Sequence, residues 1–125
     1  MDIVNSKQAP KAVGPYSHAV VHDGIVYASG QIGLDPITGK LVAGGIAAEA
    51  KQVMQNLTAV LNAAGSAPGQ IIKTGIYLID MTDFSVVNAL YAEWLGDHRP
   101  ARATVAVAQL PLGAKVEMDV IAAKG

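Results

Sequence analysis

The chain has no cysteine among its 125 residues, which excludes disulfide frameworks, thiolate metal sites and cysteine nucleophiles. Charge and aromatic side chains are also sparse: nine Lys and Arg stand against ten Asp and Glu, and Phe and Trp occur once each. The net charge of −1 provides no broad positive field for a nucleic acid or an anionic membrane. We therefore expect neither as a partner.

Long hydrophobic runs are absent as well. No unbroken apolar run exceeds four residues, whereas a membrane-spanning helix needs about 20. The segment Met1–Lys7 lacks the apolar stretch of a secretory signal, so we expect a cytoplasmic protein. Hydrophobic residues still make up 51% of the chain, with Ala and 13 Gly prominent. This composition predicts a single domain over residues 1–125, with apolar surface left for self-association.

Hydrophobic spacing and turn residues predict an α+β domain. The predicted elements are strands at 19–22 and 25–29, a helix at 46–64, a strand at 72–79, a helix at 84–95, and strands at 103–109 and 115–123. Alternation with a period of two marks the strands, and apolar steps of three and four mark the helices. Gly65 and Gly96 end the two helices. The order ββαβαββ predicts a mixed sheet with both helices on one face.

The first hairpin has a register that follows from its turn. Asp23-Gly24 suits a two-residue type I′ turn, so His22 faces Ile25 and the numbers of each pair sum to 47. Because side chains alternate along a strand, this register places four polar side chains on one face: Tyr16, His18, Ser29 and Gln31. Such a face is either solvent-exposed or the lining of a site.

Arg102 is the candidate anchor for a small organic acid. It follows the Pro100 loop and begins an apolar strand, and its planar guanidinium can bind a carboxylate through two parallel hydrogen bonds. Glu117 and Asp119 lie two residues apart on a strand and so share a face. Arg102 and Glu117 share a face only if the last two strands pair with an odd residue sum. An ordinary surface ion pair and a half-exposed strand are the alternative interpretations.

The sequence predicts no metal or nucleotide site. His18 and His22 are four residues apart, but on a strand they have no third ligand nearby. The glycine-rich segment 29–33 lacks the Lys-Ser/Thr pair and the glycine spacing of phosphate-binding loops. We therefore expect neither a metal nor a cofactor.

Several separated motifs together resemble the Rid family of reactive intermediate (imine) deaminases over essentially the whole chain. They are Gly14-Pro15-Tyr16-Ser17, Ser29-Gly30-Gln31-Ile32, Asn56-Leu57, Ala63-Ala64-Gly65, Val87-Asn88, Pro100-Ala101-Arg102-Ala103, Leu110-Pro111 and Val116-Glu117-Met118. The resemblance implies a chorismate-mutase-like subunit, a homotrimer with a barrel-like core, and ligand sites between neighbouring subunits. It also implies hydrolysis of enamine and imine acids, such as 2-aminoacrylate and 2-aminocrotonate, to 2-oxo acids and ammonia without a cofactor.

The same resemblance implies roles for individual residues. Arg102 would bind the substrate carboxylate, and Glu117 would position or activate the attacking water. The other residues implied to line the pocket are Tyr16, Ser29, Gly30, Asn88 and Thr104. The family often has Ser-Cys after the arginine, where this chain has Ala103-Thr104. A hydroxyl or the backbone would therefore take the place of the thiol.

Two other functions stay open at this point. A non-catalytic protein could use Arg102 to bind a 2-oxo acid, and only the presence of Glu117 favours the enzyme over it. RNA cleavage is an activity attributed to some relatives. It is disfavoured here, because the chain has no basic patch and few aromatic side chains to stack on bases.

Overall fold

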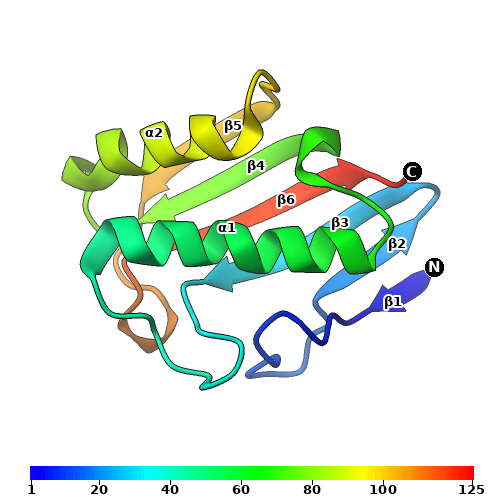
Figure 1. Cartoon of the computed structure of the whole chain (residues 1–125), viewed down its shortest axis with the longest axis horizontal. Helices are drawn as coiled ribbons and strands as arrows, with labels where there is room; N and C mark the ends of the chain where they lie inside the picture. Colours follow the sequence, from blue (N-terminus) through cyan, green and yellow to red (C-terminus); the bar gives the residue numbers. More distant parts are fainter.

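The computed structural model describes all 125 residues and contains one six-stranded sheet with both helices on the same face (Figure 1). The strands are β1 (Asp2–Val4), β2 (Ala19–His22), β3 (Ile25–Ile32), β4 (Ile71–Leu78), β5 (Ala101–Ala106) and β6 (Val116–Ala123), and the helices are α1 (Gly45–Ala63) and α2 (Phe84–Leu95). Three short 3₁₀ turns lie at Pro68–Gln70, Met81–Asp83 and Pro111–Gly113. Neither α1 nor α2 combines the length and the hydropathy that a membrane-spanning helix requires. The predicted fold class is confirmed.

The last two strands, β5 and β6, do not pair with each other. The pairing under which Arg102 and Glu117 would share a face is therefore absent. The sheet order is β1-β2-β3-β6-β4-β5. β5 runs parallel to β4, because α2 returns the chain to the end of the sheet at which β4 began. β6 then lies antiparallel between β3 and β4. The face that each β5 side chain takes is therefore set by β4 and not by β6.

The β2–β3 hairpin has the predicted register. His22 pairs with Ile25, and Asp23 and Gly24 have φ values of 51° and 76°, the left-handed values that a type I′ turn requires. One strand was missed: β1 pairs antiparallel with β2 and extends the sheet at that edge. The turn residues alone thus fix the alignment of β2 with β3.

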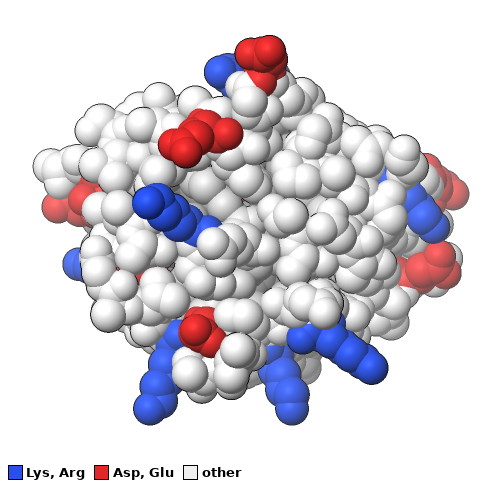
Figure 2. All heavy atoms as spheres, viewed as in Figure 1, with Lys and Arg blue, Asp and Glu red and all other residues white.

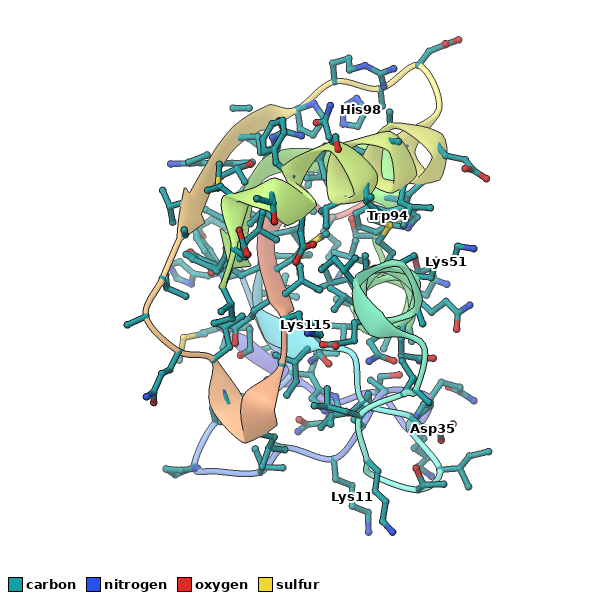
Figure 3. All side chains as sticks on the ribbon, turned by 90° about the vertical axis from the view of Figure 1, so that its left-hand side faces the viewer. Lys11, Asp35, Lys51, Trp94, His98 and Lys115 are labelled. Atoms are coloured by element: carbon teal, nitrogen blue, oxygen red, sulfur yellow. The ribbon has the colours of Figure 1, made fainter.

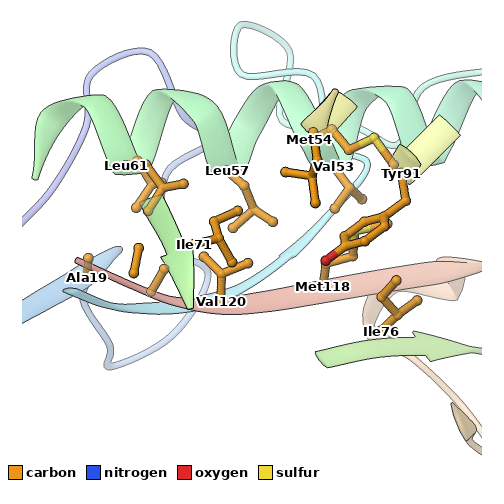
Figure 4. Packing of buried hydrophobic residues seen from close by; sticks show 14 of the residues in the cluster. Ala19, Val53, Met54, Leu57, Leu61, Ile71, Ile76, Tyr91, Met118 and Val120 are labelled. Carbon is orange, nitrogen blue, oxygen red and sulfur yellow. The ribbon is translucent and has the colours of Figure 1, made fainter. Parts of the chain in front are cut away.

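The hydrophobic core lies between the helices and one face of the sheet (Figure 4). Leu57 of α1, Met118 of β6 and Ile76 of β4 are each at most 1% exposed. Burying a side chain of this size contributes about 2–3 kcal/mol. Alternate residues of β6 enter this core, so the residues between them, including Glu117, point to the opposite face.

That opposite face of the sheet is left uncovered, since both helices lie on the other side. Tyr27 of β3 and Val105 of β5 lie on it, and each is 47% exposed. On the side of the molecule that carries the helices, charged side chains of both signs lie mainly around the rim (Figure 2). On the uncovered face, the exposed Tyr27 and Val105 provide apolar surface of the kind that the composition predicted.

Candidate active site

The sheet separates the two candidate chemical groups. Arg102 is in register with Thr74, whose side chain is fully buried beneath α2, so Arg102 points to the side of the helices. Glu117 is in register with Tyr77 and points to the uncovered face. Within one chain, Arg102 and Glu117 therefore line different cavities.

Arg102 is held in place by side chains of α2. Its Nη1 donates a 2.7 Å hydrogen bond to Asn88 Oδ1. Its guanidinium carbon lies 5.1 Å from the centre of the Tyr91 ring and 5.6 Å from that of Phe84, within cation–π range. Tyr91 is itself fixed, because its hydroxyl donates a 2.9 Å hydrogen bond to Thr74 Oγ1. The other N–H groups of the guanidinium make no hydrogen bond within the chain and can donate to an anion.

The cavity beside Arg102 has a volume of about 390 Å³. Its lining residues are Asn88, Tyr91, Ala92, Arg99, Pro100 and Arg102. Thr104 follows on the same face of β5, and its Oγ1 is buried without a hydrogen-bond partner. Thr104 is not part of the cavity lining, so within one chain its hydroxyl lies beside the cavity and does not open into it.

The second cavity, of about 350 Å³, lies where the N-terminal loop meets β3 and β6. Its lining includes Lys11, Tyr16, Ser29, Gly30, Gln31 and Glu117. The pairing of β3 with β6 shifts in register between Ala28 and Gln31. An irregularity of this kind bends the strand and allows three consecutive residues, 29–31, to reach one cavity.

Gly30 makes room for the Glu117 carboxyl group. A Cβ at residue 30 would lie 2.6 Å from Glu117 Oε2, closer than a real Cβ comes to an oxygen. The neighbouring Ser29 hydroxyl donates a 2.6 Å hydrogen bond to the carbonyl of Ser17, which ties β3 to the segment before β2. Burial, and then the charge of Asp119, raises the pKa of Glu117. A raised pKa suits a carboxyl that must exchange a proton close to neutral pH.

The structure thus brings the predicted site residues together as two groups. Tyr16, Ser29, Gly30 and Glu117 share one cavity, while Arg102 and Asn88 share the other, with Thr104 nearby on β5. No three His, Asp or Glu side chains lie close enough together to hold a metal ion. Both groups offer polar contacts without a charge cluster of the metal-binding kind.

His18 was predicted to share a polar face with Tyr16, and this is wrong. Its buried ring ties down the N-terminal segment: Nδ1 accepts a 2.9 Å hydrogen bond from the Ser6 N–H, so Nε2 donates to the Pro10 carbonyl at 2.7 Å. Lys11 was missed. It projects from the loop end of the molecule (Figure 3), and no periodic pattern in this irregular segment could have placed it beside a cavity.

Comparison with known proteins gives matches along nearly the whole chain. Residues 6–124 match the sequence profile of the family described as Endoribonuclease L-PSP. The human 2-iminobutanoate/2-iminopropanoate deaminase is 44% identical over 123 residues, which cover 98% of this chain and 90% of the human protein.

Solved structures match equally well. YyfA from Yersinia pestis, described as a member of the conserved Rid protein family, has a TM-score of 0.95 and 45% identity, with 98% of both chains covered. The E. coli protein TdcF, solved with bound serine, has a TM-score of 0.94 and 34% identity, with 100% of both chains covered.

Proposed function

The chain belongs to the Endoribonuclease L-PSP family, which includes the Rid proteins, and on this basis we propose that it is a 2-iminobutanoate/2-iminopropanoate deaminase. The observation that carries the proposal is the near full-length match to mammalian enzymes of that name. Such an enzyme is a hydrolase that converts the C=N group of a small imino acid to a 2-oxo acid and ammonia. The proposal includes a cytoplasmic location and no cofactor or nucleic-acid partner.

The residues of the two cavities can supply this chemistry. The substrate carries a carboxylate next to its imine carbon, and the free N–H groups of Arg102 can bind that carboxylate in a fork. Water then adds to the imine carbon while Glu117 takes one of its protons. A protonated imine is already electrophilic, so holding the acid and one water in place provides much of the rate.

Arg102 and Glu117 can act on one substrate only if two copies of the chain meet. We place the active site between subunits of a homotrimer: Arg102, Asn88 and Thr104 come from one copy, and the cavity of Glu117 comes from the next. Three observations support this arrangement. The two residues lie on opposite faces of the sheet, β5 is an edge strand, and the uncovered sheet face exposes Tyr27 and Val105.

The direct test is release of 2-oxo acid from freshly generated 2-iminopropanoate and 2-iminobutanoate. We expect the protein to accelerate release from both well above the rate in buffer. A rate equal to that in buffer, measured with intact oligomer, would overturn the proposal.

A second candidate is a non-catalytic protein that binds a 2-oxo acid or amino acid in the same cleft. The solved relative with bound serine favours this alternative, because serine is a stable amino acid. Both candidates need Arg102, but only the enzyme needs the carboxyl of Glu117. A protein that binds 2-oxobutanoate and accelerates no imine hydrolysis would be the binder.

Asn88 is expected to act through Arg102. Asn88→Ala removes the acceptor that orients the guanidinium, and a hydrogen bond to a charged group contributes about 1.5 kcal/mol, so KM should rise about tenfold with little change in kcat. Steady-state kinetics check this. The exposed Asn62 on α1 gives the matched control, Asn62→Ala. A fall in kcat at unchanged KM would contradict the assignment.

Gly30→Ala should displace the Glu117 carboxyl, since the added Cβ would lie 2.6 Å from Oε2. A misplacement of about 1 Å costs about a hundredfold in rate, and we expect a loss of that order in kcat. Gly69→Ala is the control, because a Cβ there meets no atom within 4 Å. Full activity of the folded Gly30→Ala oligomer would show that the Glu117 position is not critical.

A further inference from the structure

The uncovered face of the sheet holds a cluster of ionisable groups next to Glu117 that the proposed reaction does not use. Asp119 follows Glu117 by two residues on β6, so both point to that face. On the neighbouring strand β4, Tyr77 pairs with Glu117 and Gly75 pairs with Asp119. The Tyr77 hydroxyl reaches diagonally and donates a 3.1 Å hydrogen bond to Asp119 Oδ2.

Glycines on both flanking strands make this arrangement possible. A Cβ at Gly75 would lie 2.5 Å from Asp119 Oδ1 and 2.7 Å from the Tyr77 hydroxyl oxygen. On the other side of β6, Gly30 leaves the equivalent space for Glu117. Asp119 and Tyr77 therefore meet over Gly75, and Glu117 lies over Gly30.

No Lys or Arg side chain lies within salt-bridge distance of either carboxylate. The one contact of that kind in the structure joins the ring of His22 to Asp23 at the hairpin turn, 3.4 Å apart. Burial first, and then the charge of Asp119, raises the pKa of Glu117. Burial first, and then the hydrogen bond to Asp119, raises the pKa of Tyr77, so Tyr77 keeps its proton and stays a donor at neutral pH.

The surroundings of Glu117 contain few other ionisable groups. β4 contributes Tyr77 and, further along the same face beside Asp119, Lys73; β6 contributes Asp119, and the N-terminal loop contributes Lys11 and Tyr16 at the cavity wall. β3 contributes Ser29, Gly30 and Gln31, which carry no charge. In the proposed trimer, Arg102 of a second copy also faces this cavity. Asp119 is thus the one acidic neighbour of Glu117 within the chain.

We propose that Tyr77 and Asp119 are positioning residues for Glu117: Tyr77 fixes the Asp119 carboxylate beside it, and the fixed negative charge makes Glu117 a better proton carrier. This inference rests on the proposed deaminase function. In this inference, Tyr77, Gly75 and Asp119 together set the pH at which Glu117 gains and loses its proton.

The role of a proton carrier follows from the balance of the reaction. Starting from the protonated imine, the water oxygen bonds to the imine carbon, the C=N electron pair moves to nitrogen, and Glu117 takes one water proton. Glu117 returns that proton to nitrogen, and the C–N bond breaks with its electrons leaving on ammonia. The remaining hydroxyl proton passes to solvent as the C=O bond forms. A carboxyl that ionises closer to neutral pH performs both transfers better.

The test is titration of the ligand-free protein, with the Glu117 carboxyl carbon followed by NMR after ¹³C labelling of glutamate and assigned with Glu117→Gln. In Asp119→Asn, the Glu117 midpoint should move to lower pH, because a negative neighbour has been removed. Tyr77→Phe, which keeps every carboxylate, should move it part of the way in the same direction. Asp97→Asn, in the loop after α2, is the matched control and should leave it unchanged.

The pH profile of kcat separates positioning from a structural role. Glu117 sets one limb of this profile. Whether the reaction needs it ionised or protonated, a lower pKa of Glu117 moves that limb to lower pH, and we expect this shift in Asp119→Asn. An unchanged Glu117 midpoint in both Asp119→Asn and Tyr77→Phe would overturn the inference. A loss of activity without a shift of the limb would do the same. The NMR titration needs no substrate, so failure of the deaminase proposal appears separately, as an inactive wild-type protein.

Discussion

Arg102→Ala is expected to lower kcat/KM for 2-iminopropanoate by about a thousandfold, because it removes both hydrogen bonds and the charge that hold the substrate carboxylate, worth about 4 kcal/mol. Arg102→Lys should recover only part of the loss, since an ammonium keeps the charge but cannot form the fork. The measurement is the initial rate of 2-oxo acid release at matched oligomer concentration.

The stability of Arg102→Ala separates loss of binding from loss of fold. The Arg102 side chain is exposed, and its partners Asn88, Phe84 and Tyr91 lie on α2, which is anchored in the core by the buried side chains of Val87, Tyr91 and Leu95. We expect the unfolding midpoint and the oligomeric state to match those of the wild type. A variant that retains most of the wild-type kcat/KM would show that the carboxylate is held elsewhere.

Glu117→Gln is expected to lower kcat by about a thousandfold while leaving 2-oxobutanoate binding within a few-fold of the wild type, since proton transfer by a positioned group contributes about 10²–10⁴ in rate. Glutamine keeps the size and the hydrogen-bonding capacity of the side chain but cannot carry the proton. Rapid-quench kinetics and ligand titration measure the two quantities. Equal loss of binding and turnover would indicate that Glu117 holds the ligand and transfers no proton.

Glu117→Gln is also expected to change the stability of the folded protein, and the size of this change depends on pH. Because the pKa of Glu117 is raised in the folded protein, its folded state binds more protons than its unfolded state. Stability due to this group is therefore complete below the ordinary carboxyl pKa and is lost as pH rises through the folded-state pKa. The stability of Glu117→Gln relative to the wild type should therefore be higher at pH 7 than at pH 4. Denaturant midpoints at the two pH values check the sign.

Local chemistry was sufficient to predict several features from the sequence. Asp23-Gly24 fixes the hairpin register, because the backbone of that turn allows only one alignment of its strands. Helix boundaries followed from apolar spacing and Gly96. These features depend on neighbours in sequence, so no knowledge of distant segments was needed.

Other features depend on long-range contacts and could not be predicted in this way. The insertion of β6 between β3 and β4 decides that Arg102 and Glu117 point to opposite faces, and parity along the chain holds no information on strand order. His18 was misassigned because its partners, Ser6 and Pro10, lie in an irregular segment. Tyr77 and Asp119 hydrogen-bond across two neighbouring strands, although they lie 42 residues apart in the sequence.

The central claim is that each active site takes Arg102 from one copy and Glu117 from its neighbour. It is tested most directly by mixing the two inactive variants, Arg102→Ala and Glu117→Gln, in equal amounts, unfolding them together and refolding them into mixed oligomers. One cleft in about four then joins an intact Arg102 to an intact Glu117.

The account predicts that the mixture regains about a quarter of the wild-type rate, while each variant refolded alone stays inactive. A mixture as inactive as the separate variants, with mixed oligomers present by mass spectrometry, would contradict it, because both residues would then have to act within one chain.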